Sequence, residues 1–269
     1  VTSLDVTLQE KMQDIVTNQI NSLSYLQVGN GAAIVTNPKT GEILAMVGSR
    51  DYFDTKRDGN VNVTTSLRQP GSSIKVVTYA LALENGFTPA TILDDSPVVY
   101  TYPGYPSYAP VNYDGKFHGK VTLRTALASS YNIPAVKLLA ANGIDKLINL
   151  GQKMGITTLG DKSHFGLSLV LGGAEVKLVD MVSAYGVFAN EGVRNPWSFI
   201  QKVESSDGQI LEEKENKPDR VLEPQIARLI NNMLSDNSAR APVFGYSSSL
   251  YLPGRDVAAK TGTTQENRD

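Results

Sequence analysis

Three short motifs supply the hydroxyl, amine and amide groups that acyl transfer needs. They are Ser72-Ser73-Ile74-Lys75, Ser130-Tyr131-Asn132 and Lys260-Thr261-Gly262-Thr263. A serine hydroxyl is a poor nucleophile until a nearby base removes its proton. A lysine can be that base only when its amine is neutral. At neutral pH this requires that the pKa of the amine lies well below its reference value of about 10.4. The motifs therefore indicate a serine nucleophile activated by a lysine.

The first motif is predicted to lie at the start of a helix. Pro70-Gly71 precedes it, and the apolar pattern predicts a helix over residues 72–85 that ends at a glycine. Residues three apart share a helix face, which makes Ser72 and Lys75 neighbours. Ser73 ranks second as a nucleophile because no lysine follows it at that spacing. A solvated helix start is the alternative, since serine and lysine are common residues.

The second motif is predicted to lie on a connection between two helices. One helix is expected over residues 123–129 and the next from about Pro134, a residue preset for the first turn of a helix. Side chains on such a connection can face a cleft, so Ser130 and Asn132 supply a second hydroxyl and an amide. The alternative for Asn132 is an N-cap of the following helix.

The third motif lies on a predicted terminal strand over residues 257–264. Alternation along a strand aims Lys260 and Gly262 to one side, and Thr261 and Thr263 to the other. Twist or a bulge must therefore bring the lysine and the threonines to one site. The glycine has no side chain, which lets the backbone of a substrate approach the strand closely.

Two further tripeptides match the second and third motifs and compete with them. Ser235-Asp236-Asn237 matches the Ser-Asp-Asn variant of serine β-lactam enzymes, but it follows a helix expected over residues 224–234 and is interpreted as a helix cap. Lys39-Thr40-Gly41 follows Asn37-Pro38 in the turn of a predicted hairpin, where side chains face solvent. Neither tripeptide is assigned to the site.

The remaining pattern predicts helices and strands around these motifs. Asp5 is a plausible N-cap for an amphipathic helix that extends to Leu23. Residues 94–120 interleave prolines and tyrosines and predict a long surface loop, whose aromatic rings either pack locally or line a glycan or peptide groove. The other expected elements are a hairpin from residues 31–35 and 43–47, a buried helix over 175–190, a hairpin turn at 205–208 and a charged connector over 212–220.

Composition excludes several classes of protein. The 25 Lys plus Arg against 27 Asp plus Glu give a net charge of −2, without the basic face that nucleic-acid binding needs. No run reaches the roughly 18 to 20 apolar residues of a membrane helix. The sequence has no cysteine, which excludes disulfides and thiol catalysis. Its two histidines, His118 and His164, lack ligand-like spacing, so no metal site is expected.

Taken together, the motifs have the order and the expected helix, loop and strand context of the active-site serine penicillin-interacting enzymes. The chain resembles the transpeptidase domain of a class A, bifunctional penicillin-binding protein. The similarity covers nearly the whole chain and includes residues 37–48, 68–73, 112–119 and 129–136. It implies one transpeptidase domain over residues 1–269 with an α/β, β-lactamase/transpeptidase-like fold. In that fold an antiparallel sheet is flanked by helices, and the active site lies beside a helical region.

The resemblance also implies a role for each residue of the first two motifs. Ser72 attacks the carbonyl between the last two D-alanines of a peptidoglycan stem peptide, and Lys75 is the general base. Ser130 relays the proton to the leaving group. Asn132 holds Lys75 and the substrate amide by hydrogen bonds.

The third motif is implied to bind the substrate. Lys260 completes the catalytic set, and with the hydroxyls of Thr261 and Thr263 it binds the terminal carboxylate. The backbone amides of Ser72 and Thr263 form the oxyanion hole, and Gly262 admits the substrate backbone.

The implied activity is that of a D,D-transpeptidase whose serine β-lactams acylate. Its partners are stem peptides and β-lactams, and no cofactor is needed. The implied location is the outer face of a bacterial cytoplasmic membrane. The chain opens at Val1 without an initiator Met, which indicates a piece of a longer protein, and the resemblance implies a glycosyltransferase domain and a membrane anchor before it. Two strands and a helix are expected after Asp269, in the same protein or in a second chain.

Two other functions remain open from the sequence. In a β-lactamase or D,D-carboxypeptidase, water hydrolyses the acyl-enzyme. A fast β-lactamase needs a base that activates this water, and Glu175 is the one candidate for it. A penicillin-sensing receptor is acylated once and signals, without joining two stem peptides.

Overall fold

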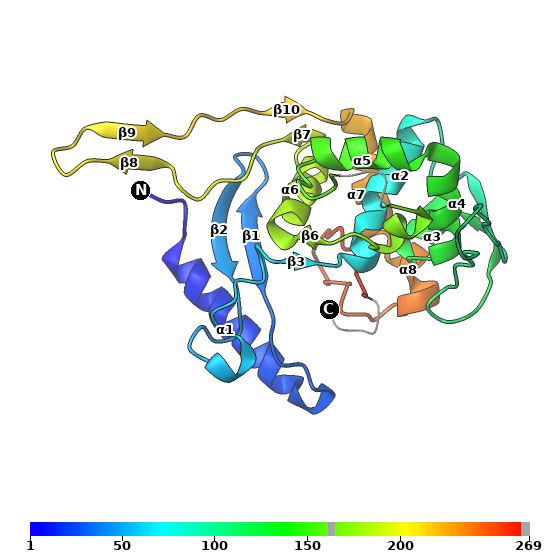
Figure 1. Ribbon diagram of the computed structural model, residues 1–269, viewed down its shortest axis with the longest axis horizontal. Coiled ribbons are helices and arrows are strands. Elements are labelled where there is room, and N and C mark those ends of the chain that lie inside the picture. The colour runs from blue at the N-terminus through cyan, green and yellow to red at the C-terminus, as the bar shows by residue number, and fades with distance from the viewer. Residues whose placement is uncertain (161–164, 265–269) are drawn as a thin grey trace. The chain divides into compact units, whose positions relative to one another are not determined.

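A computed structural model describes residues 1–160 and 165–264 of the chain (Figure 1). Its residues fall into two compact units. The mixed unit comprises Val1–Arg68, Gln152–Thr158 and Glu175–Leu222, and the helical unit comprises Gln69–Gly151, Leu159–Ala174 and Glu223–Asp269. That residues 1–269 act as one transpeptidase domain stays a prediction.

The mixed unit begins with a helix packed on a hairpin. Helix α1 (Val6–Ser22) starts after Asp5, whose carboxylate accepts a hydrogen bond from the Leu8 amide at 3.0 Å. Strands β1 (Ala33–Asn37) and β2 (Glu42–Val47) form the antiparallel hairpin, and α1 packs against β2 (Figure 1). Both predictions are confirmed, because capping and turn residues act locally.

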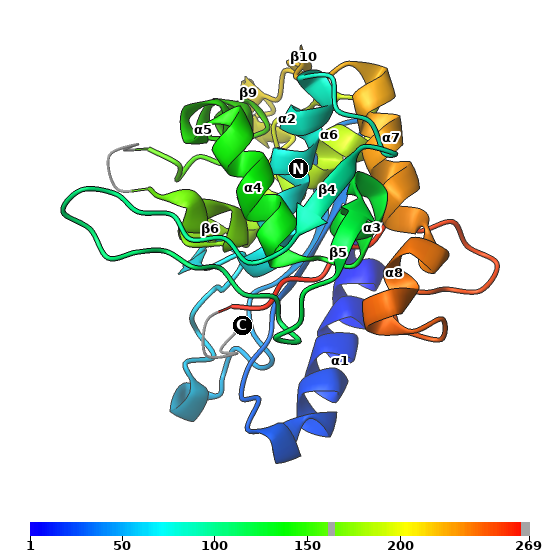
Figure 2. The same cartoon turned by 90° about the vertical axis from the view of Figure 1, so that its right-hand side faces the viewer.

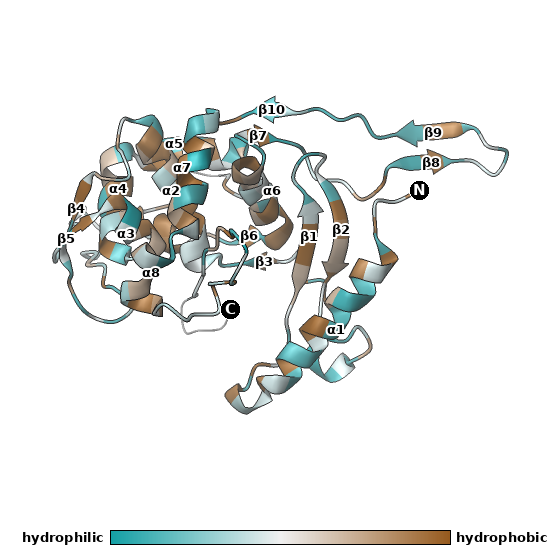
Figure 3. Ribbon diagram, turned by 180° about the vertical axis from the view of Figure 1, so that it is seen from behind, coloured by the Kyte–Doolittle hydropathy of each residue, from teal (hydrophilic) through white to brown (hydrophobic). Residues whose placement is uncertain are grey.

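The rest of the mixed unit consists of one helix and short strand pairs. Helix α6 (Leu178–Ala189) packs against β1, and Figure 3 shows hydrophobic residues on α6 and on both strands of the hairpin. The predicted turn at residues 205–208 is confirmed by the pair on either side of it, β8 (Lys202–Glu204) and β9 (Ile210–Glu213). The other elements are β3 (Leu67–Arg68) paired with β6 (Val176–Lys177), β7 (Val193–Arg194) paired with β10 (Asp219–Arg220), and the 3-10 turns η1 (Ser24–Leu26) and η2 (Thr55–Arg57).

The helical unit surrounds one buried helix, α2 (Lys75–Glu84). Every residue of α2 from Lys75 to Leu83 is buried, and the helix packs against α4 and α7 (Figure 2). A helix that is apolar on all sides belongs in a core, so the single charged residue at its start is desolvated as well. The surrounding elements are η3 (Gly71–Ile74), β4 (Ile92–Asp95) paired with β5 (Gly119–Thr122), α3 (Leu123–Ala128), α4 (Asn132–Asn142), α5 (Ile144–Lys153), η5 (Leu167–Leu171), α7 (Pro224–Ser235) and α8 (Asn237–Phe244).

Several expected elements differ in the structure. The helix predicted over residues 72–85 begins as the 3-10 turn η3 and becomes α-helical only at Lys75. The strand predicted over residues 257–264 is wrong, since these residues join no strand pair within the described part of the chain. An alternating pattern favours an extended backbone but does not supply the neighbouring strand that makes a sheet. The loop predicted over 94–120 is bounded by the β4–β5 pair, and α4 begins at Asn132, two residues before Pro134.

The strands of the described residues form five separate antiparallel pairs, β1–β2, β3–β6, β4–β5, β7–β10 and β8–β9. Among the described residues, no helix has the length and apolar character that crossing a membrane requires.

Candidate active site

Ser72 lies in a 3-10 turn that a glycine shapes. Gly71 has φ +53°, and a Cβ atom at this position would lie 2.4 Å from the carbonyl oxygen of Thr263. A Cβ atom at Gly262 would likewise lie 2.6 Å from the carbonyl oxygen of Pro70. The two glycines therefore allow the Lys-Thr-Gly segment to lie directly against the turn that carries Ser72.

Lys75 is the first residue of α2, and its side chain is fully buried. Its Nζ lies 2.6 Å from the Asn132 Oδ1, 2.7 Å from the Ser130 carbonyl oxygen and 3.2 Å from the Tyr131 carbonyl oxygen. Burial lowers the pKa of the Lys75 amine well below its ordinary value, and the positive charge of Lys260 lowers it further. This is the environment that the first motif requires of a lysine base.

The second motif forms the connection between α3 and α4, as predicted. Ser130 has φ +60°, a left-handed conformation that is uncommon outside glycine. Asn132 opens α4, and its side chain does not cap the helix: Oδ1 contacts Lys75, and Nδ2 donates to the Val111 carbonyl oxygen at 2.8 Å. The N-cap alternative for Asn132 is therefore wrong.

Lys260 reaches the same serine from the third motif. Its Nζ donates to the Ser130 Oγ at 2.8 Å and to the Thr261 carbonyl oxygen at 2.7 Å. The Lys75 Nζ lies 3.4 Å from the same Oγ. Burial lowers the pKa of Lys260 to about 7. The fully buried Lys75 and the partly buried Lys260 thus meet at one hydroxyl.

These groups border a cleft within the helical unit that has a volume of about 910 Å³. Ser72, Ser130 and Asn132 line it together with residues 261–264. Two tyrosines of the predicted surface loop, Tyr108 and Tyr113, also line it, which agrees with the groove interpretation of that loop. Lys75 and Lys260 contact the lining residues through their hydrogen bonds to Ser130 and Asn132.

The competing residues lie elsewhere or are otherwise engaged. The Ser73 Oγ donates to the Pro70 carbonyl oxygen at 2.6 Å. In the second Ser-Asp-Asn match, the Asp236 Oδ1 accepts from the Ala239 amide at 2.9 Å and caps α8, which confirms its interpretation as a helix cap. Lys39-Thr40-Gly41 lies in the β1–β2 turn, also as predicted.

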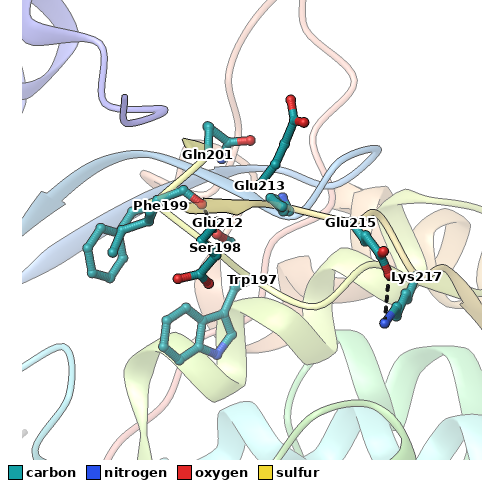
Figure 4. A pocket seen from close by; sticks show the side chains of 10 residues that line it. Trp197, Ser198, Phe199, Gln201, Glu212, Glu213, Glu215 and Lys217 are labelled. Carbon is teal, nitrogen blue, oxygen red and sulfur yellow. Dashed lines mark hydrogen bonds and ion pairs between the residues drawn. The ribbon is translucent and has the colours of Figure 1, made fainter. Parts of the chain in front are cut away.

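A second hollow, of about 520 Å³, lies in the mixed unit around Trp197 and Phe199 (Figure 4). Two contacts among its polar groups are local: the Ser198 hydroxyl donates to the Ile200 carbonyl oxygen at 2.8 Å, and the Lys217 Nζ lies 2.9 Å from the Glu215 carboxylate (Figure 4). It does not combine a serine with a buried lysine, so it offers no counterpart to the first cleft.

Sequence reasoning did not identify Asn112. This buried residue accepts a hydrogen bond from the Asn132 amide at 2.8 Å through its Oδ1. It lies within residues 112–119, which carry part of the family similarity. That similarity is the sequence signal that could have identified Asn112.

The geometry can be compared with known proteins. The family model of the penicillin-binding protein transpeptidase domain matches residues 31–269. The chain is 32% identical over 289 residues to penicillin-binding protein 1A of Rickettsia bellii, covering 100% of this chain and 35% of that relative. It is 39% identical over 241 residues to penicillin-binding protein 1A of Aquifex aeolicus, covering 89% of this chain and 32% of that relative.

A solved structure shows the same fold. The penicillin-binding protein PonA1 of Mycobacterium tuberculosis, in complex with penicillin V, superposes with a TM-score of 0.76 at 27% identity, covering 100% of this chain and 70% of that chain. The chain therefore belongs to the transpeptidase domain family of penicillin-binding proteins, and the predicted class A resemblance and transpeptidase-like fold are confirmed. It spans about a third of the length of the two curated relatives named above.

Proposed function

We propose that this chain is a serine D,D-transpeptidase domain that cross-links peptidoglycan stem peptides and that β-lactams inhibit by acylation. The observation that carries the proposal is the Ser130 hydroxyl, which contacts both Lys75 and Lys260 and borders the same cleft as Ser72. Membership of the penicillin-binding transpeptidase family supports the reaction class. The solved complex of PonA1 with penicillin V supports β-lactam binding.

In the proposed acylation, the Ser72 Oγ attacks the carbonyl carbon between the last two D-alanines. The neutral Lys75 amine takes the serine proton, and Asn132 Oδ1 and the Ser130 carbonyl oxygen accept its two N–H groups. The backbone amides of Ser72 and Thr263 stabilise the oxyanion. The C–N bond then breaks, Ser130 gives its proton to the departing D-alanine amine, and Lys75 returns a proton to Ser130. The product is an ester on Ser72.

In the second half of the reaction, the amine of another stem peptide attacks this ester. The C–O bond to Ser72 breaks, and the serine regains its proton through the same groups in reverse. Lys260 in its cationic form, with the hydroxyls of Thr261 and Thr263, binds the terminal carboxylate of the donor. Gly262 lets the donor backbone approach.

The context of the whole protein extends this proposal. We infer an extracytoplasmic location on a bacterial cytoplasmic membrane, with an anchor and a glycosyltransferase domain elsewhere in the protein. The curated relatives are about three times longer than the matched segment, which is consistent with further domains in those proteins.

The test is to incubate the protein with a donor stem pentapeptide and an excess of an acceptor stem peptide with a free side-chain amine. A cross-linked dimer with release of D-alanine is expected, and neither is expected from Ser72→Ala. Hydrolysis of the donor without a dimer would favour the carboxypeptidase alternative. Rapid repeated hydrolysis of a chromogenic β-lactam would favour the β-lactamase. A stable adduct without either peptide product would favour the sensor.

A further inference from the structure

Asn112 caps helix α4 from outside the helix. Its side chain is 4% exposed, and its Oδ1 accepts from the Asn132 amide at 2.8 Å and from the Ile133 amide at 3.4 Å. The first amides of a helix have no partner within the helix, and α4 receives no hydrogen bond from its own N-cap side chain. Asn112 therefore fixes the main chain at the residue that contacts Lys75.

Asp95 determines which way the Asn112 amide points. It is fully buried at the end of β4, and its Oδ1 and Oδ2 accept from the Asn112 Nδ2 at 2.9 and 2.8 Å. A carboxylate only accepts hydrogen bonds, so it holds the amide nitrogen toward itself and the amide oxygen toward α4. The Asn112 Nδ2 also donates to the Lys116 carbonyl oxygen at 2.8 Å, which supports the same orientation.

A second contact from Asp95 supports the middle of the Ser130–Asn132 turn. The His118 Nδ1 lies 2.6 Å from the Asp95 Oδ2, and the His118 amide donates to the same oxygen at 3.0 Å. The imidazole stacks on the ring of Tyr131 with centroids 4.0 Å apart and an interplanar angle of 16°. The Tyr131 carbonyl oxygen in turn lies 3.2 Å from the Lys75 Nζ.

The turn needs such support because its first residue is strained. Ser130 adopts φ +60°, and strained conformations persist when their surroundings over-determine them. Asn112 and its neighbour Val111 hold the far end of the turn: Asn112 binds the Asn132 amide, and Val111 binds the Asn132 Nδ2. Main chain and side chain of Asn132 are thus fixed independently.

We propose that Asp95 and Asn112, the Asp95–Asn112 pair, are positioning residues for acyl transfer. The pair holds Asn132 so that its Oδ1 meets the Lys75 Nζ, and it thereby keeps Ser130 between the two lysines. Neither residue of the pair is among the residues that line the cleft. Asn112 acts through Asn132, and Asp95 acts through Asn112 and also, by way of His118, through Tyr131. The inference rests on the proposed function, because it assigns the pair to the same acylation step.

The test measures penicillin acylation by Asn112→Ala and separates the dissociation constant of the initial complex from the first-order rate of acylation. A loss of about 10- to 100-fold is expected in the rate, because small misplacements of catalytic groups are costly, with little change in the dissociation constant. Asp95→Asn conserves volume and loses the carboxylate. Asp95→Asn should also lower the acylation rate. If Asn112→Ala does not fold, Asp95→Asn serves as the test variant.

Asn142→Ala is the matched control. Asn142 is another buried asparagine, at the opposite end of α4, and it binds the Leu138 carbonyl oxygen and the Asn85 side chain. This variant should lose stability but acylate at the wild-type rate. Equal losses of acylation in the Asn112 and Asn142 variants would overturn the proposal, as would a folded Asn112→Ala protein that acylates normally.

Two further measurements isolate the path through Asn132. In an Asn132→Ala background, Asn112→Ala should add almost nothing to the loss of rate, whereas multiplying effects would contradict action through Asn132. Amide hydrogen exchange at Asn132 and Ile133 should accelerate in Asn112→Ala and not in Asn142→Ala. Hydrogen exchange is measured without any acylation, so unchanged exchange in Asn112→Ala would refute the positioning role by itself. A wild-type protein that does not react with penicillin would instead refute the proposed function.

Discussion

Lys260 donates a hydrogen bond to the hydroxyl of Ser130 at 2.8 Å, although 130 residues separate them in the sequence. Because Lys75 approaches the same hydroxyl at 3.4 Å, one oxygen connects the two amines. Lys75 is fully buried and Lys260 is partly buried, and their desolvation disfavours a positive charge on either. Ser130 is therefore the group through which a proton can pass between Lys75 and the cleft.

Removing this hydroxyl should stop acylation without unfolding the protein. Ser130→Ala is expected to lower the rate of penicillin acylation by about 100- to 10,000-fold, the usual contribution of a general acid or base. The matched control is Ser129→Ala, since the buried Ser129 hydroxyl donates to the Ala239 carbonyl oxygen at 2.9 Å. It should lose stability and keep a rate within a few fold of the wild type. Quenched time courses followed by mass spectrometry measure both, and equal rates for the two variants would contradict the role of Ser130.

Acylation should depend on pH through both lysines. Lys75 must be neutral, so the rate should rise with pH through its lowered pKa. Lys260 must be cationic to bind a carboxylate, so the affinity for a penicillin should fall as pH rises through about 7. The fall should approach tenfold per pH unit, and a penicillin methyl ester should not show it. If the affinities for a penicillin and for its methyl ester fall equally as the pH rises, Lys260 does not bind the carboxylate.

Stability should increase with pH over the range in which Lys75 and Lys260 are neutral in the folded state. The pKa of Lys260 is about 7 when folded and about 10.4 when unfolded, so the unfolded chain binds more protons between these values. The free energy of unfolding should therefore rise from pH 7 to 9 by about 1.4 kcal/mol per pH unit for one such group. Lys75, whose pKa is also lowered, adds in the same direction.

Urea unfolding at pH 7, 8 and 9 measures how the free energy of unfolding changes with pH. In Lys260→Met this slope should be smaller by the contribution of one titrating group. Burial also raises the pKa of Tyr79 and Tyr185, which acts in the opposite sense only near pH 10 and above. A free energy of unfolding that falls between pH 7 and 9 would contradict the neutral state of the lysines.

The contact between Gly71 and the Lys-Thr-Gly segment can be tested against another glycine that has a positive φ but no close neighbour. Gly71→Ala introduces a methyl group 2.4 Å from the Thr263 carbonyl oxygen, whereas Gly86, at φ +89°, has nothing within 4 Å of a Cβ atom. Gly86→Ala should cost about 1–2 kcal/mol of stability and leave acylation unchanged. Gly71→Ala should displace residues 261–264 and lower the acylation rate at least tenfold. Equal rates in the two variants would show that the close approach has no role in the site.

Much of the fold and the site could be predicted because the relevant signals are local. The Asp5 cap, the β1–β2 turn and the connection between α3 and α4 depend on neighbours within a few positions, and the structure has them where the sequence indicates. The bonds that join the motifs to one another could be anticipated only from the family resemblance. The assignment of catalytic roles to these residues remains a prediction that the experiments test.

The sequence could not indicate features that depend on distant partners. Residues 257–264 have a strand pattern, but a strand needs a neighbour, which no local pattern specifies. Helix α8 contains Pro242, and a proline within a segment argues against a helix. The helix is nevertheless capped by Asp236 and packs against α3. Asn112 is a capping residue for a helix that begins 20 positions later, so the local rules for caps did not find it.

The most direct test of the account is intact-mass analysis after incubation with a penicillin. The wild-type protein should gain the mass of one penicillin, and Ser73→Ala should gain it as well, because the Ser73 hydroxyl is bound to the Pro70 carbonyl oxygen. Ser72→Ala should gain nothing, and peptide mapping of the wild type should locate the adduct at Ser72. An adduct that persists in Ser72→Ala, or that disappears only in Ser73→Ala, would contradict the assignment of the nucleophile.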